Sequence, residues 1–148
     1  MQPALRNQII AILDRANEMT IATIREDGYP QATTVSYVHD GLTIYFGCGM
    51  SSQKASNIAR NRKVSLAINL PYANWDDICG LSLGGTAMRV ADSKEKEKFS
   101  RLIFKKFMQV AQYASSGSAE VAVIRVTPIV LSILDYKKGF GHTELIKV

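Results

Sequence analysis

Two Asp-Gly turns in the first third of the chain constrain the fold more than any other feature. They stand at Asp27-Gly28 and Asp40-Gly41, between the segments MTIATIRED, QATTVSYVH and LTIYFG, which are rich in β-branched and aromatic residues. Asp-Gly between such segments is typical of a β-hairpin. The sequence therefore predicts three successive antiparallel strands, an arrangement that differs from a βαβ unit.

Three helices are expected around these strands. Apolar residues at helical spacing predict an amphipathic helix at the N-terminus, with Pro3 in its first turn. A short helix capped by a serine is expected at 51–61. The capping-box spacing of Asp92 and Glu95 predicts a longer helix that runs to about Tyr113.

Further strands are expected later in the chain, at 64–70, 80–90, 120–127 and 129–136. The Gly84-Gly85 pair indicates a bulge or a close backbone approach, and Pro128 must lie at an edge or a bulge because it donates no ladder hydrogen bond. The tail from 137 to 148 stays unassigned. The prediction is a mainly β fold with flanking helices, whose six or seven antiparallel strands close into a barrel.

Composition limits the class of protein. The chain has 148 residues, 47% of them hydrophobic, so we expect one domain over 1–148 with a substantial core and no need for disulfides. No apolar run approaches the ~18 residues of a membrane span, and the N-terminus does not look like a secretory signal, so a cytoplasmic location is the default. Cys48, Cys79, His39 and His142 are too scattered to predict a metal site.

The net positive charge favours an anionic ligand but does not identify which one. The chain carries 18 Lys and Arg against 13 Asp and Glu, a net charge of +5, but the basic residues are dispersed along it. Small barrels can bind single-stranded nucleic acid by interleaving aromatic and basic residues on a strand. Tyr37, Tyr45 and Phe46 do not alternate with Lys or Arg, so this nucleic-acid alternative is disfavoured.

The junction between the third strand and the next helix, Phe46 to Lys54, is the strongest candidate site. A helix N-terminus presents unpaired N–H groups and the positive end of the helix dipole, and here Ser51, Ser52 and Lys54 lie beside it. These features suit a phosphate. The alternative is a serine that only caps the helix and a solvated lysine. A Rossmann fingerprint does not fit, because Ser52 stands where its third glycine belongs.

From Met19 to Leu70 the chain resembles the pyridoxamine 5'-phosphate oxidase-like family, the FMN-binding split barrels. The shared pattern is a strand, the turn Gly28-x-Pro30, further strands and then a set of motif residues. These residues are Ser52, Lys54, Ala55, Asn57, Ile58, Asn61 and Val64. The resemblance continues through Gly85-Thr86-Ala87 and the stretch Ile124 to Pro128, and so covers most of the chain.

The resemblance implies a homodimer that holds two FMN molecules in clefts between its subunits. It places the phosphate at Ser52 and Lys54, the ribityl chain and ring edge along Thr33, Thr34, Val35 and Ser36, and the flavin beside Phe46, Gly47 and Cys48. The neighbouring Ser51 and Gln53 are further candidates for cofactor binding. The family often has arginines where this chain has Gln53 and Thr33. Fewer positive charges then face the phosphate, which leaves room for another phosphorylated ligand.

The predicted function is an FMN-dependent oxidoreductase with no obvious general acid or base among its side chains. Pyridoxamine 5'-phosphate oxidase recognises its substrate with two stretches near its C-terminus. In the first stretch this chain has Val130 in place of the second Arg, and the second stretch, Arg-x-His-Asp-Arg, is missing here. Vitamin B6 oxidation is therefore not expected. The alternatives are a non-catalytic flavin-binding protein and a relative that binds a deazaflavin or haem.

Three further side chains have both a functional and a structural interpretation. Trp75 could cover a flavin, but a lone loop aromatic more often packs on the nearest core. Cys48 is more often a small buried hydrophobe than a reactive thiol. His142 lies in Gly139-Phe140-Gly141-His142, a segment that could fold over a ligand.

Overall fold

The computed structural model describes residues 1–114 and 120–148. In this part the helices are α1 (Pro3–Arg15), α2 (Gln53–Arg60), α3 (Ser93–Lys106) and α4 (Val110–Ala114), with short 3-10 turns η1 (Trp75–Asp77) and η2 (Tyr136–Lys138). The strands are β1 (Glu18–Ile24), β2 (Pro30–Ser36), β3 (Val38–Asp40), β4 (Thr43–Gly49), β5 (Lys63–Asn69), β6 (Cys79–Arg89), β7 (Val121–Asp135) and β8 (Thr143–Lys147).

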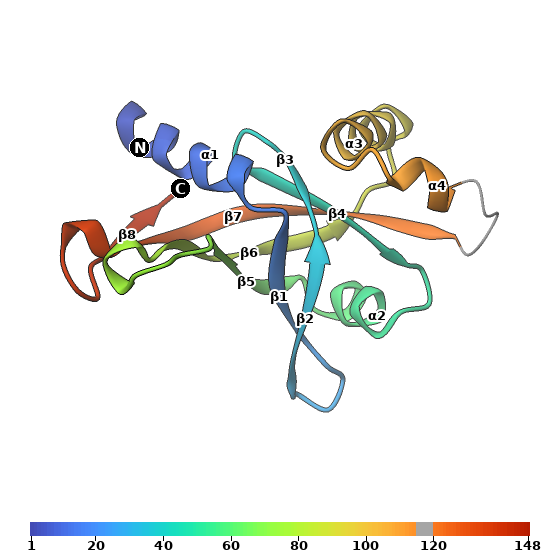
Figure 1. The fold of residues 1–148 in the computed structure, drawn as a ribbon. Coiled ribbons are helices and arrows are strands. Elements are labelled where there is room, and N and C mark those ends of the chain that lie inside the picture. Colours follow the sequence, from blue (N-terminus) through green and yellow to red (C-terminus); the bar gives the residue numbers. More distant parts are fainter. Residues whose placement is uncertain (115–119) are drawn as a thin grey trace.

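The strands form one curled antiparallel sheet in the order β2-β1-β5-β6-β7-β4-β3, with β8 also paired to β7 (Figure 1). The mainly β antiparallel fold with flanking helices is therefore confirmed. Both Asp-Gly turns have a glycine with positive φ, 88° at Gly28 and 58° at Gly41. Glycine adopts this conformation without steric cost, which is why these turns can be tight. The unassigned tail supplies η2 and β8.

The strand β7 runs unbroken through Pro128, where the sequence predicted two strands. Pro128 lies between the part of β7 that pairs with β4 (Val121–Val126) and the part that pairs with β8 (Val130–Leu134). On its other side the register with β6 shifts between Gly84 and Gly85, so the predicted bulge is confirmed. The missing N–H of the proline is tolerated because it falls at this irregularity.

The long helix is shorter than predicted. It ends at Lys106, not near Tyr113, because Phe107 leaves the helical conformation with φ −128° and ψ 82°, and α4 follows as a separate short helix. At its start Asp92 caps the helix by accepting a hydrogen bond from the Glu95 amide, as predicted.

The core lies inside the curled sheet, and α1 and α2 close its opposite ends (Figure 1). At the α1 end the buried Tyr37 hydroxyl donates to the Leu13 carbonyl at 2.8 Å. At the other end the buried Asn57 of α2 bonds to Thr23 of β1. A second, smaller cluster lies between α3 and the sheet and includes Tyr45 and Phe99. The fold thus holds α2 against the β1–β2 hairpin, where the candidate site begins.

Candidate functional site

The strand β2 lies at one end of the strand order, so within the described part of the chain only one of its backbone edges is paired, to β1. Its residues alternate in burial: Thr33 and Val35 are half-buried, whereas Thr34 and Ser36 are exposed. The strand β4 approaches β2, but in residues 1–114 and 120–148 the two share no ladder. The split between them therefore offers unpaired backbone N–H and C=O groups.

The structure gives the three predicted residues at the end of β4, Phe46, Gly47 and Cys48, different surroundings. Phe46 is fully buried in the core, so it can meet a ligand only through its backbone. A Cβ on Gly47 would lie 3.1 Å from Val121 Cγ1 and 3.5 Å from the Phe99 ring, so this residue faces α3 instead. Cys48 is half-buried and packs against the main core cluster, as its structural interpretation expects.

The N-terminus of α2 has the geometry of an anion-binding site, in which some of the backbone N–H groups are already hydrogen-bonded and others are free. Ser52 is the N-cap, and its hydroxyl accepts from the Ala55 amide at 3.2 Å. The amides of Gln53 and Lys54 have no acceptor among the described residues, as first-turn amides have none within the helix. Lys54 is half-buried and has no carboxylate within ion-pair distance in this part of the chain. Ser51 is exposed beside it.

A buried amide network fixes the position of this helix end. Asn57 donates to Thr23 Oγ1 at 3.0 Å and to Gln31 Oε1 at 3.1 Å. Its own Oδ1 accepts from Gln53 Nε2 at 2.8 Å and from Arg60 Nη2 at 3.3 Å. The Gln53 side chain is therefore turned along the helix, away from the first-turn amides. Sequence reasoning saw Asn57 only as a motif residue and missed this positioning role.

The charge near the helix end is nearly balanced. Arg25, Glu26, Asp27 and Gln53 line an open hollow of about 400 Å³. Arg25 is paired with Asp27 at 3.1 Å. The pKa of the Asp27 carboxyl is lowered, mainly by a hydrogen bond from the Tyr29 amide; desolvation opposes this shift, and the hydrogen bond from Arg25 adds to it. The positive groups left for an anion are thus Lys54 and the helix dipole.

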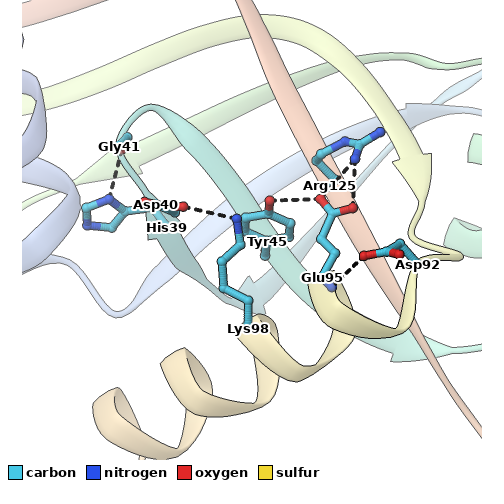
Figure 2. A network of polar contacts seen from close by, with 8 residues as sticks. All are labelled: His39, Asp40, Gly41, Tyr45, Asp92, Glu95, Lys98 and Arg125. Atoms are coloured by element: carbon cyan, nitrogen blue, oxygen red, sulfur yellow. Dashed lines mark hydrogen bonds and ion pairs between the residues drawn. The ribbon is translucent and has the colours of Figure 1, made fainter.

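Arg125, the arginine that aligns with the C-terminal stretch of the resembled oxidase, is used in the scaffold. Figure 2 shows its Nη1 donating to both carboxylate oxygens of Glu95 on α3, each at 2.9 Å. The Tyr45 hydroxyl donates to the same carboxylate at 2.9 Å, and Lys98 bonds to Asp40 at 3.0 Å. Burial raises the pKa of Glu95, but the hydrogen bonds from Arg125 and Tyr45 outweigh it and bring the pKa below its ordinary value of 4.5.

The turn η1, which contains Trp75, contacts η2, which is followed by the His142 segment. In Figure 1 the loop before β8 lies far from α2. Trp75 is 66% exposed and contacts the Phe140 ring at a centroid distance of 6.1 Å, so it does not pack on the core. The structure therefore does not bring these two predicted residues to α2 within one protomer. Among the described residues no His, Cys, Asp and Glu side chains gather into a possible metal site.

A family model described as pyridoxamine 5'-phosphate oxidase matches residues 5–134 of the chain. The chain belongs to this family. The chain is similar to a putative pyridoxamine 5'-phosphate oxidase from Listeria innocua, whose crystal structure is known. The two sequences are 27% identical, the structures superpose with a TM-score of 0.70, and the match covers 88% of this chain and 98% of that one. A heme binding protein from Mycobacterium smegmatis is 21% identical with a TM-score of 0.81, over 99% of this chain and 59% of that one.

General stress protein 26 of Bacillus subtilis is 26% identical over 76 residues. The match covers 51% of this chain and 54% of that protein, so the chain spans about half the length of this curated family relative. Within residues 1–114 and 120–148, no helix has both the length and the apolarity to cross a membrane.

Proposed function

We propose that the chain binds FMN in the split between β2 and β4 and acts as an oxidoreductase. The observation that carries this proposal is the first turn of α2, whose amides and Lys54 ammonium have no acceptor or carboxylate partner in residues 1–114 and 120–148, beside the edge of β2 that is unpaired in the same residues. Membership of the pyridoxamine 5'-phosphate oxidase family supports the same site.

The donors at α2 suit the phosphate of FMN. The amides of Gln53 and Lys54, the Lys54 ammonium and the exposed Ser51 hydroxyl can all face a dianion, aided by the helix dipole. Each hydrogen bond to a charged group contributes about 1.5–3 kcal/mol. Three such bonds supply much of the ~8 kcal/mol needed for micromolar affinity.

The split itself suits the rest of the cofactor. The free edge of β2 offers backbone donors and acceptors to the ribityl chain and the ring edge from Thr33 to Ser36, and Val35 and Cys48 add apolar surface. Bound FMN would supply reversible uptake of electrons or hydride. The protein's own part is to hold the phosphate, orient the ring and exclude water, with no side chain assigned as a general acid or base.

We also propose that the working form is a homodimer with the cofactor between the subunits. Small residues follow one another in register across the outward face of the sheet, from Thr34 to Thr20, Ala67, Ser82 and Ser132. Most of them are exposed. A row of small side chains on the outward face lets a second copy approach the sheet closely, and a stable interface requires about 800 Å² per partner.

Flavin fluorescence titration of Lys54→Ala tests the phosphate site. The variant should bind FMN about 10-fold or more weakly, because it loses one charged hydrogen bond. Lys63→Ala is the matched control, since Lys63 is an exposed lysine at the start of β5. Equal affinity of wild type and Lys54→Ala, or a protein that takes up no FMN, contradicts the proposal. Turnover of a nicotinamide cofactor by the loaded protein separates an enzyme from a flavin-binding protein.

Haem is the second candidate ligand, because the chain shares its fold over 99% of its length with a protein named for heme binding. A haem needs an axial ligand, and His142 is half-buried near the sheet end. The absorbance of the purified protein after incubation with each ligand distinguishes the two. A Soret band that is lost in His142→Ala supports haem, and flavin bands unchanged in that variant support FMN.

A further inference from the structure

A second cavity lies on the other flank of α2, between this helix and the strands β6 and β7. It has a volume of about 380 Å³, within the range of small-molecule sites. The residues that line it come from the loop after β4, from α2, from β6 and from β7. This cavity has no part in the proposed flavin site.

The two flanks of α2 are distinct. Gln53 and Asn57 lie one turn apart on the flank that bonds to β1 and β2. Ala55 and Ala59, also one turn apart, line the cavity. A helix turns by about 100° per residue, so residues 55 and 59 lie roughly 160° from residue 57. The cavity therefore faces away from the β2 edge.

Most of the side chains that line the cavity are apolar, although its exposed lining surface is about as polar as it is apolar. Four apolar side chains of the lining are buried, those of Ile58, Ala87, Ala122 and Ile124, and the Ser56 hydroxyl is one of its polar groups. No carboxylate is among the lining residues of the described chain. An apolar body can thus be desolvated there without leaving a charge unpaired.

Two arginines that have no acidic partner among the described residues lie at this cavity. Arg62 and Arg89 both line it and are exposed. They are near one another in the fold, because the Arg62 carbonyl accepts from the Ala87 amide at 2.8 Å, two residues before Arg89. Arg89 contacts Met50 Sδ at 3.5 Å, and in the described residues neither guanidinium has a carboxylate within ion-pair distance.

We propose that this cavity binds an organic carboxylate with a short apolar chain, whose carboxylate is held by Arg62 and Arg89. A guanidinium fork matches the two oxygens of a carboxylate, which a lysine does not. The apolar wall accepts the body of the ligand, and the Ser56 hydroxyl is available to the carboxylate. Because the cavity and the flavin split lie on opposite flanks of α2, both ligands bind together.

Isothermal titration calorimetry with octanoate tests the proposal, with and without saturating FMN. Octanoate should bind saturably, and amide NMR shifts should centre on Ala59 and Ala87. Arg62→Gln and Arg89→Gln should each weaken binding about 10-fold, since each removes a charged hydrogen bond. Arg101→Gln is the matched control, because it removes the same charge from an exposed site on α3. Ala59→Leu keeps both arginines and should abolish binding by filling the cavity.

Four outcomes overturn the proposal. Octanol binding as tightly as octanoate means that the arginines do not select a carboxylate. Inorganic phosphate binding as tightly means that the apolar wall does not contribute. An equal loss in Arg101→Gln means that only net charge matters. Displacement of octanoate by FMN means that the cavity belongs to the flavin site. A failure to bind FMN leaves the octanoate result unaffected, so the two proposals fail separately.

Discussion

At the scale of single residues, Asn57 has the largest predicted effect on stability. It is completely buried, and it satisfies the Thr23 hydroxyl, which is only 2% exposed. Asn57→Leu keeps the branched shape of the side chain but is larger and removes these hydrogen bonds, and each buried polar group left unpaired costs about 1–3 kcal/mol. We expect the free energy of unfolding in urea to fall by about 2–3 kcal/mol.

Gln53→Ala is the control for this prediction, since it removes an exposed partner of the same network and should cost under about 1 kcal/mol. FMN affinity should also fall in Asn57→Leu, because the helix end loses its fixed position against β1. A variant as stable as wild type would show that the network does not hold α2.

Sequence reasoning identified the local part of this site and missed the nonlocal part. The Ser52 cap and the free first turn of α2 follow from residues adjacent in the chain, so they were predictable. The Asn57 bonds reach Thr23 and Gln31, which are 34 and 26 positions away, and they depend on how α2 lies against the hairpin. Likewise, the spacing of Gln53 does not reveal that its side chain bonds to Asn57.

At the scale of elements, the attachment of α3 to the sheet should depend on pH through Glu95. Because its pKa is lowered in the folded protein, the unfolded chain takes up the proton first as the pH falls. The stabilisation by Arg125 is therefore complete above the unfolded pKa, near 4.5, and is lost as the pH falls through the lower folded value.

Urea unfolding of Glu95→Gln across pH 3–7 checks this dependence. The variant should be about 1 kcal/mol less stable than wild type at neutral pH, given the partial exposure of the ion pair, and the difference should vanish in acid. Glu97→Gln, an exposed change on the same helix, should show no such trend. A difference that stays constant with pH would mean that the carboxylate charge is not what attaches α3.

The ends of elements were less predictable than their existence. Apolar spacing continues past Lys106, so the sequence predicted one helix to Tyr113. In the fold the Lys106 ammonium bonds to the Ala16 carbonyl at 2.6 Å and lies 4.2 Å from the centre of the Tyr37 ring. These partners are far away in the chain, and no periodicity reveals them. The strand β8 was missed for a similar reason, because its alternation is short and its stability comes from pairing with β7.

At the scale of the whole molecule, the proposed dimer predicts that a charge on the outward sheet face will abolish assembly. Ala67 is exposed and central in the row of small residues, flanked by Thr20 and Ser82. An arginine there would have to be buried without a partner when two sheets meet, which costs several kcal/mol. Ala67→Arg should therefore be a folded monomer in sedimentation velocity experiments.

The same variant distinguishes a cofactor held between subunits from one held by a single protomer. If the partner completes the flavin site, Ala67→Arg should lose FMN binding together with assembly, although position 67 is on β5 and not at the α2 terminus. Ser100→Arg adds the same charge to the exposed face of α3 and should leave both properties intact. A monomeric variant with wild-type FMN affinity would place the whole cofactor site in one chain, and a variant that stays dimeric would assign the interface to another face.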